Sequence, residues 1–160
     1  IDIGGESTRP GSDPVSTDEE LKRIVPIIEA IKKISDIAIS IDTYKPEVMK
    51  EVIDMDVAMI NDIFALQKPN AIDLLKKSNV GVCLMHMQGT PKTMQLNPTY
   101  KNVVSEVRSF LEKRANLIVN EGIGKSRIIL DPGFGFGKTL EHNYELLNKL
   151  EELKKHKTCH

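Results

Sequence analysis

Short apolar runs and longer amphipathic segments alternate along the whole chain. The apolar runs are rich in Ile and Val and are continuous, which is typical of parallel strands covered on both faces. They predict five strands, at 1–4, 37–41, 57–60, 80–85 and 128–130. The segments between and after them place apolar residues at helical spacing, which predicts helices at 17–35, 46–55, 69–77, 99–121 and 139–155.

The first predicted helix contains a local conflict. Ser16 or Thr17, each followed three residues later by a glutamate, can cap its start. Pro26 lies inside the same segment, and an internal proline removes one backbone hydrogen bond at a cost of about 3 kcal/mol. We therefore expect a kink at Pro26 or a helix that starts later. Ordinary end signals mark the other helices, namely Pro46, Pro69, Gly122 and Thr139.

Regular alternation of strands and helices with short links predicts parallel strands joined by right-handed crossovers. An open doubly wound sheet and a β/α barrel both satisfy this pattern. Most runs end in polar residues, namely Asp42, Asn61 with Asp62, His86 and Asp131. Contributions from several strand ends favour a barrel. Because a complete barrel takes about 250 residues, we predict an α/β chain with residues 1–160 forming one incomplete domain, part of a (β/α)8 TIM barrel.

Composition narrows the class of protein. With 40% apolar and 28% charged residues, the chain is typical of a soluble globular domain. Its formal charge of -1 argues against nucleic acid or an anionic membrane as partner, and the basic cluster at 154–157 is interpreted as a solvated helix end. No apolar stretch approaches the roughly 20 residues of a membrane span.

Cys83 and Cys159 form no disulfide framework and favour a reducing cytoplasm. Ile1 is not an initiator methionine, so we expect a fragment.

The polar residues at three strand ends are the first candidates for a binding site. Asp42 and Asp131 offer carboxylate acceptors, and Asn61 offers an amide that donates and accepts. Such a set suits a flat heterocycle with several N–H donors and a carbonyl. Each residue alone can equally cap the next helix, but their shared position at strand ends favours a site. Met85 either packs in the core or forms the floor of a pocket.

Loops after the strands add further candidates. Arg9 can present a planar fork to a carboxylate or diphosphate, with Thr8 adding a hydroxyl, although a plain surface turn is the alternative. In the loop 131–138, the glycines let a ligand lie against the backbone, and Phe136 can supply a ring face. That loop matches neither the phosphate-binding nor the dinucleotide pattern of glycines. No histidines stand at zinc-ligand spacing, and no nucleophile has an evident base.

Taken together and in order, five segments resemble motifs of the dihydropteroate synthase family, whose members are pterin-binding β/α barrels. They are Gly4–Gly11 (GGESTRPG), Ser40–Thr43 (SIDT), Ile60–Asp62 (IND), Met85–Pro91 (MHMQGTP) and Asp131–Lys138 (DPGFGFGK). The resemblance implies a pterin pocket formed by Asp42, Asn61, Met85, Asp131 and Lys138. It also implies that Thr8, Arg9 and Pro10 belong to a mobile loop that shapes the aminobenzoate and diphosphate sites, and that Phe136 packs against the aminobenzoate ring.

The resemblance also implies a reaction. Family members join p-aminobenzoate, through its amine, to the methylene of hydroxymethyl-dihydropterin diphosphate and release diphosphate. Asp42 is the candidate to stabilise positive charge on the methylene, and Arg9 is the candidate to bind the leaving diphosphate. The same resemblance implies Mg²⁺ as cofactor, a cytoplasmic homodimer when the protein is complete, a place in folate biosynthesis and a target for sulfonamides.

The chain lacks parts of the family pattern. The first strand with its magnesium-binding asparagine, a Ser-Arg-Lys segment and an Arg-x-His segment have no counterpart, so the match covers strands two to six. No metal ligand is therefore assigned to this chain, and we expect the chain alone to be inactive. Two alternatives are a methyltetrahydrofolate-corrinoid methyltransferase, which as a rule lacks the GESTRPG loop, and a non-catalytic pterin-binding remnant.

Overall fold

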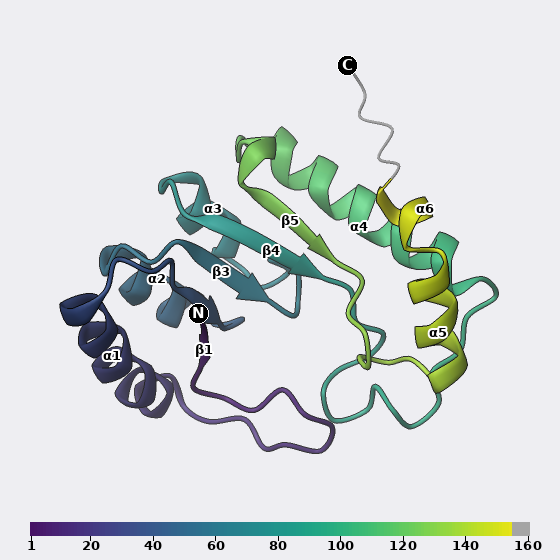
Figure 1. The fold of residues 1–160 in the computed structure, drawn as a ribbon, viewed down its shortest axis with the longest axis horizontal. Coiled ribbons are helices and arrows are strands. Elements are labelled where there is room, and N and C mark those ends of the chain that lie inside the picture. Colours follow the sequence, from purple (N-terminus) through teal and green to yellow (C-terminus); the bar gives the residue numbers. More distant parts are fainter. Residues whose placement is uncertain (155–160) are drawn as a thin grey trace.

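A computed structural model describes residues 1–154 of the chain. Its five strands form one parallel sheet, with neighbours in the order β1-β2-β3-β4-β5 (Figure 1). The strands are β1 (Asp2–Gly4), β2 (Ser40–Asp42), β3 (Met59–Asp62), β4 (Gly81–Met85) and β5 (Ile128–Asp131). The predicted strands are therefore all present, but four of the five begin one to three residues later than expected.

The order of the strands decides between the two predicted architectures. Each strand pairs with the next one along the chain, as in a β/α barrel. A doubly wound sheet would instead reverse its order at a switch point. The chain therefore folds as consecutive units of a partial barrel, which confirms the predicted fold class.

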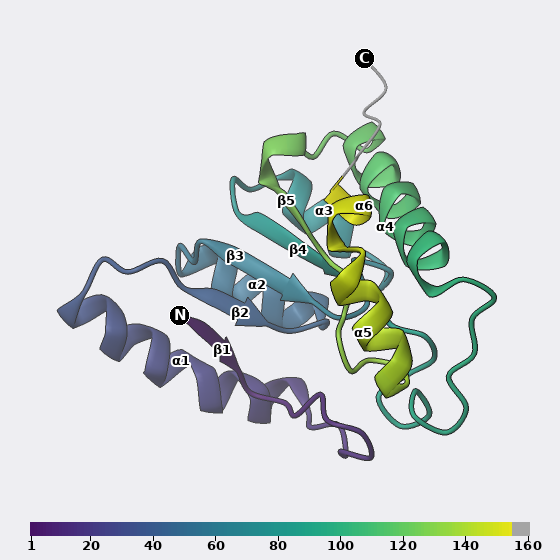
Figure 2. The ribbon, with the colours of Figure 1, turned by 45° about the vertical axis from the view of Figure 1, so that its right-hand side comes forward.

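Helices follow the strands and cover one face of the sheet, as Figures 1 and 2 show. They are α1 (Thr17–Ile34), α2 (Pro46–Asp54), α3 (Ala71–Lys76), α4 (Val103–Asn120), the 3-10 turn η1 (Lys125–Arg127), α5 (Leu140–Asn148) and α6 (Leu150–Lys154). Ile24 of α1, Met49 of α2 and Leu75 of α3 are fully buried against that face. The main core therefore lies between helices and sheet.

The register separates the residues of the strands into two faces. Ile41 and Ile60 are paired and belong to the helix-covered core. Because side chains alternate between faces, their neighbours Asp42 and Asn61 lie together on the opposite face, called the inner face below. Ile129 also lies on the inner face, and its side chain is 55% exposed. The prediction that the strands are covered on both faces is thus met only on the helix side.

Helix α1 starts at its predicted cap. Ser16 Oγ accepts from the Glu19 amide, and the helix continues through Pro26 to Ile34. The interpretation of a later start is therefore wrong. Pro26 lies on the exposed side of the helix, where water can hydrate the carbonyl that loses its donor.

Three other predicted helix boundaries are corrected by the structure. The single helix expected at 139–155 is divided at Lys149 into α5 and α6, and position 155 lies outside the described residues. Helix α3 begins after Asn70, whose left-handed backbone (φ 68°) excludes Pro69 from the first turn. Helix α4 begins after Asn102, whose side chain accepts from the Ser105 amide. The boundaries at Asn70 and Lys149 follow from the backbone angles of single residues, and the one at Asn102 from a local hydrogen bond, neither of which apolar periodicity encodes.

Candidate active site

Four predicted site residues lie together at the carboxyl end of the sheet. Asp42 is paired in register with Asn61, and Met85 is paired with Asp131. All four side chains belong to the inner face, because Asn61 pairs with Cys83, two residues before Met85. The structure thus brings together Asp42, Asn61, Met85 and Asp131, which we call the inner-face row.

Asp42 has an unusual electrostatic environment. Burial raises the pKa of its carboxyl to about 7, and the charges of Asp2, Glu20, Asp62 and Glu6 raise it further toward that value. Within residues 1–154, its side chain makes no hydrogen bond or ion pair. An isolated carboxyl of this kind gains most from a cationic or N–H-donating ligand, which would restore its ionised form.

Asn61 presents an unused acceptor. Its Nδ2 donates to Asp2 Oδ2 at 3.4 Å, which fixes the orientation of the amide. Its Oδ1 is buried, and no partner for it is found in the part of the chain that the structure describes. Buried acceptors are nearly always paired in folded proteins. The free Oδ1 of Asn61 is therefore suited to a ligand N–H at the inner face.

Asp131 uses one oxygen to shape its own loop. Its Oδ1 accepts from the Gly133 amide at 2.7 Å. Gly133 has φ 67°, and a Cβ there would overlap the carbonyl oxygen of His86. A Cβ at Gly137 would likewise lie 2.5 Å from the carbonyl oxygen of Gln88. These two glycines thus allow close packing of two loops of the protein, whereas we had expected them to admit a ligand.

Lys138 is buried and holds the glycine-rich loop. Its Nζ lies 3.0 Å from His86 Nδ1 and donates to the carbonyls of Gly133 at 2.9 Å and Phe136 at 3.0 Å, with a longer contact to the His86 carbonyl. The side chain is 3% exposed, and burial lowers the pKa of its ammonium to about 8. Burial and the Lys138 charge lower the pKa of His86 to about 4. An ammonium thus joins the loops after β4 and β5.

Two further side chains fasten the same loop. Tyr100 OH donates to the Gly137 carbonyl at 2.7 Å, and Gln95 Nε2 donates to the Gly135 carbonyl. Phe136 lies between these anchored positions and is half-buried. The backbone that carries Phe136 is therefore fixed from several sides.

The loop of Arg9 is held less tightly. Thr8 is half-buried, whereas Arg9 and Pro10 are exposed. The Gly11 amide donates to the Pro91 carbonyl at 3.3 Å, which brings this loop beside the loop after β4. Among residues 1–154, the Arg9 guanidinium has no hydrogen-bond or ion-pair partner. Arg9 is thus free to bind an anion, and no contact joins it to the inner-face row.

Sequence patterns missed several residues around the site. Asp2 was not singled out, although it lies two residues before Gly4 and so shares the inner face with the residues paired to Gly4. Glu20 was read only as a capping residue, yet it lies four residues before Ile24 on the buried stripe of α1 and is 1% exposed. The position of a charged residue, Glu20, on the apolar stripe of α1 was the signal in the sequence that could have indicated a buried ionic contact. The His86–Lys138 contact had no signal, because 52 residues separate the partners.

Metal ligands and membrane spans are not found in the described chain. Residues 1–154 contain no group of three or more His, Cys, Asp or Glu side chains placed to hold a metal ion. Magnesium is usually held by one or two carboxylates together with substrate phosphates and waters. A site of that kind needs no such group, and no magnesium ligand is assigned among these residues. Among these residues, every helix is too short or too polar to cross a bilayer.

Comparison with known proteins identifies the family. The profile of the family described as "Pterin binding enzyme" matches residues 1–160. The chain belongs to the pterin-binding enzyme family. Within it, the chain is 53% identical over 152 residues to the dihydropteroate synthase of Haemophilus influenzae and 49% identical to that of Escherichia coli K12. These matches cover 95% of this chain but 55% and 54% of the relatives, so the chain spans about half their length.

Solved structures of pterin-binding enzymes share the fold. Yersinia pestis dihydropteroate synthase in complex with a sulfonamide drug superposes with a TM-score of 0.93 at 48% identity, covering 97% of this chain and 56% of that one. The Burkholderia cenocepacia enzyme complexed with 7,8-dihydropteroate gives a TM-score of 0.87 at 48% identity, covering 95% and 55%. The Xanthomonas albilineans enzyme with 4-aminobenzoic acid gives 0.88 at 45% identity, covering 95% and 54%.

Proposed function

We propose that the complete protein containing this chain is a dihydropteroate synthase of folate biosynthesis. It would condense p-aminobenzoate with hydroxymethyl-dihydropterin diphosphate and release dihydropteroate and diphosphate. The observation that carries the proposal is the inner-face row, with its unpartnered Asp42 carboxyl and the free buried Oδ1 of Asn61. The 7,8-dihydropteroate, 4-aminobenzoic acid and sulfonamide complexes of similar proteins support it.

The inner-face row is proposed to bind the pterin. Asp42 and Asn61 would accept from ring N–H groups, and the amide of Asn61 can also donate to a ring carbonyl or nitrogen. The second oxygen of Asp131 remains for the ligand, because only Oδ1 is used by Gly133. Met85 is 4% exposed and would pack on the pterin ring.

The neighbouring loops are proposed to bind the second substrate and the leaving group. Phe136 would pack against the aminobenzoate ring. Thr8, Arg9 and Pro10 would shape the aminobenzoate and diphosphate sites, with the unpaired Arg9 guanidinium as the anion ligand. Lys138 would act on the pterin side by fixing the glycine-rich loop, since its ammonium is already engaged by acceptors of the protein.

The proposed chemistry breaks one bond and forms another. The bond between the pterin methylene and the diphosphate oxygen breaks, and the bond from the aminobenzoate nitrogen to the same carbon forms, after which the nitrogen loses a proton. Positive charge develops on the methylene as diphosphate leaves. The ionised Asp42 carboxylate would stabilise that charge, and Arg9 would stabilise the negative charge on diphosphate.

Other properties of the complete protein are proposed on the resemblance. They are a homodimeric assembly, a cytoplasmic location and sensitivity to sulfonamides. The magnesium ion that the resemblance implies would have to be held with help from residues outside this chain.

A hybrid enzyme tests the function. In it, this chain replaces the matching half of the Haemophilus influenzae dihydropteroate synthase, and dihydropteroate and diphosphate are measured with both substrates and magnesium. We expect both products in equal amounts. A hybrid that unfolds as cooperatively as its parent but forms neither product would contradict the proposal.

Arg9→Ala in the hybrid enzyme tests the proposed division of roles. We expect lower turnover or weaker aminobenzoate binding, with pterin affinity changed much less. Arg108→Ala, on α4, is the control because the ion pair of Arg108 is formed with Glu112 of the same helix. Steady-state kinetics in which Arg9→Ala and Arg108→Ala behave alike would show that Arg9 is ordinary surface.

A further inference from the structure

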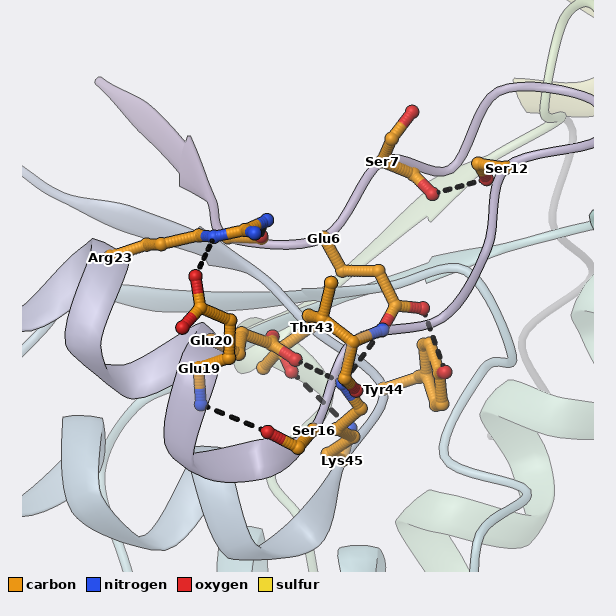
Figure 3. Close-up of polar contacts among 12 residues, drawn as sticks. Glu6, Ser7, Ser12, Ser16, Glu19, Glu20, Arg23, Thr43, Tyr44 and Lys45 are labelled. Atoms are coloured by element: carbon orange, nitrogen blue, oxygen red, sulfur yellow. Dashed lines mark hydrogen bonds and ion pairs between the residues drawn. The ribbon is translucent and has the colours of Figure 1, made fainter.

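A buried ionic network closes the base of the Arg9 loop. The loop spans residues 7–14, and its two ends are Glu6 and Val15. Glu6 Oε2 accepts from the Val15 amide at 2.9 Å, and Lys45 Nζ donates both to that oxygen, at 2.7 Å, and to the Val15 carbonyl, at 2.7 Å (Figure 3). One lysine and one glutamate therefore hold both ends of the loop together.

The same network is fixed to α1 and to the segment after β2. Lys45 Nζ also donates to Glu20 Oε2 of α1 at 2.6 Å, and Tyr44 OH donates to Glu6 Oε1 at 2.8 Å (Figure 3). Side-chain exposure is 12% for Lys45, 10% for Glu6 and 1% for Glu20. Contacts so well shielded from water form a rigid attachment, unlike exposed ion pairs, which contribute little.

Charge keeps the network together at neutral pH. Although burial raises the pKa of Glu6, hydrogen bonds from Lys45, Val15 and Tyr44 bring it below its usual value. Burial lowers the pKa of Lys45, but the hydrogen bonds and charges of Glu20 and Glu6 raise it above its usual value. Both groups are therefore ionised when they hold the loop.

Beyond its base, the loop makes mainly internal contacts. Ser12 Oγ donates to the carbonyls of Ser7 at 2.6 Å and Arg9 at 2.8 Å, and the Ser12 amide donates to the Arg9 carbonyl at 3.1 Å. Its outside contacts are the Gly11–Pro91 hydrogen bond and an exposed Lys92–Asp13 ion pair of 3.3 Å. The position of Arg9 relative to the sheet is thus set chiefly at the base.

Lys45 also connects this base to the inner-face row. It lies three residues after Asp42, on the segment that leaves β2. We propose that Lys45 is a positioning residue, which places Arg9 over the inner-face row by fixing both ends of its loop through Glu6 and Val15. This inference rests on the proposed function of Arg9, and Lys45 itself touches no substrate.

The test uses the hybrid enzyme with Lys45→Met, which keeps an unbranched apolar stem and removes the ammonium. We expect kcat/KM for aminobenzoate to fall about 10- to 100-fold, as for other misplaced binding groups, while the calorimetric Kd for the pterin diphosphate changes less than about twofold. Lys45→Arg should recover part of the loss, since it keeps the charge but not the compact geometry of three acceptors.

Lys32→Met is the matched control. Lys32 Nζ also donates to two backbone carbonyls, those of Met55 and Asp56, but at the opposite end of α1. It should leave both constants unchanged. If Lys45→Met lowered kcat, pterin binding and aminobenzoate use by the same factor, its role would be general stability and the proposal would be overturned.

Amide exchange gives a second, local measurement. The Val15 amide should exchange at least about 10-fold faster in Lys45→Met than in the unmodified hybrid, because its acceptor Glu6 loses its anchor. Unchanged Val15 exchange together with unchanged aminobenzoate kinetics would refute the anchoring role. An unmodified hybrid without activity would instead refute the proposed function, so the two failures are distinguishable.

Discussion

The ammonium nitrogen of Lys138 lies 3.0 Å from Nδ1 of His86, and this contact joins the loops that follow β4 and β5. An ammonium can only donate, so Nδ1 must accept and the ring proton must reside on Nε2. The Phe110 ring packs edge-on against His86, with centroids 5.0 Å apart, and fixes the plane of the imidazole. The two loops are thus joined by a polar contact that is buried from water.

The first prediction concerns the protonation of His86. Its folded-state pKa of about 4 lies below the ordinary value of 6.5, so its contribution to stability is present above about pH 6.5 and is lost as the pH falls toward 4. Nitrogen-15 NMR of the ring should show the Nε2–H tautomer at pH 7, with no protonation above about pH 5. A ring that titrates near pH 6.5 would contradict the buried contact.

Removal of the Lys138 ammonium gives the second prediction. Lys138→Met would leave the carbonyls of Gly133 and Phe136 without their donor, and we expect the hybrid enzyme to lose about 1–3 kcal/mol of stability. Lys92→Met is the control, because its ion pair is exposed and should contribute less than about 1 kcal/mol. Urea denaturation compares the two. Equal effects would mean that Lys138 is dispensable for the loop.

The third prediction concerns Asp42. Because its folded-state pKa of about 7 lies above the unfolded value of 3.8, its carboxylate destabilises the folded chain; the penalty is absent below about pH 4 and complete above about pH 7. Carbon-13 NMR of the carboxyl should give a midpoint near pH 7. Asp2→Asn should lower that midpoint by removing a neighbouring charge, whereas Asp73→Asn on the exposed side of α3 should not. A midpoint near 4 would contradict the environment described.

The fold was predictable because its strong signals are local. Continuous Ile and Val runs located all five strands, and helical spacing located the helices that cover them. The division at Lys149 and the late start after Asn70 were not predictable, since both depend on backbone angles of a single residue. The disruption expected at Pro26 did not occur, because a helix tolerates proline where the carbonyl left unpaired faces solvent. Apolar spacing alone does not reveal that Pro26 faces solvent.

The arrangement of the candidate site was predictable only in part. The convergence of Asp42, Asn61 and Asp131 could be predicted because parallel strands end at the same edge of the sheet. The roles of Lys45 and Lys138 in holding loops depend on contacts between segments 30 to 52 residues apart, which no single-sequence pattern contains. The sequence shows the glycines of the loop 131–138 but not what lies against them. The structure shows that Gly133 packs closely on the backbone of His86.

Asp131→Asn in the hybrid enzyme most directly tests whether the inner-face row binds the pterin. The amide oxygen can still accept from Gly133, so the loop should persist, while the amide nitrogen would replace the remaining oxygen and face ligand donors. Losing a charge-assisted hydrogen bond of about 1.5–3 kcal/mol predicts roughly 10- to 150-fold weaker binding of hydroxymethyl-dihydropterin diphosphate by calorimetry. Unchanged affinity in a folded Asp131→Asn protein would place the pterin elsewhere.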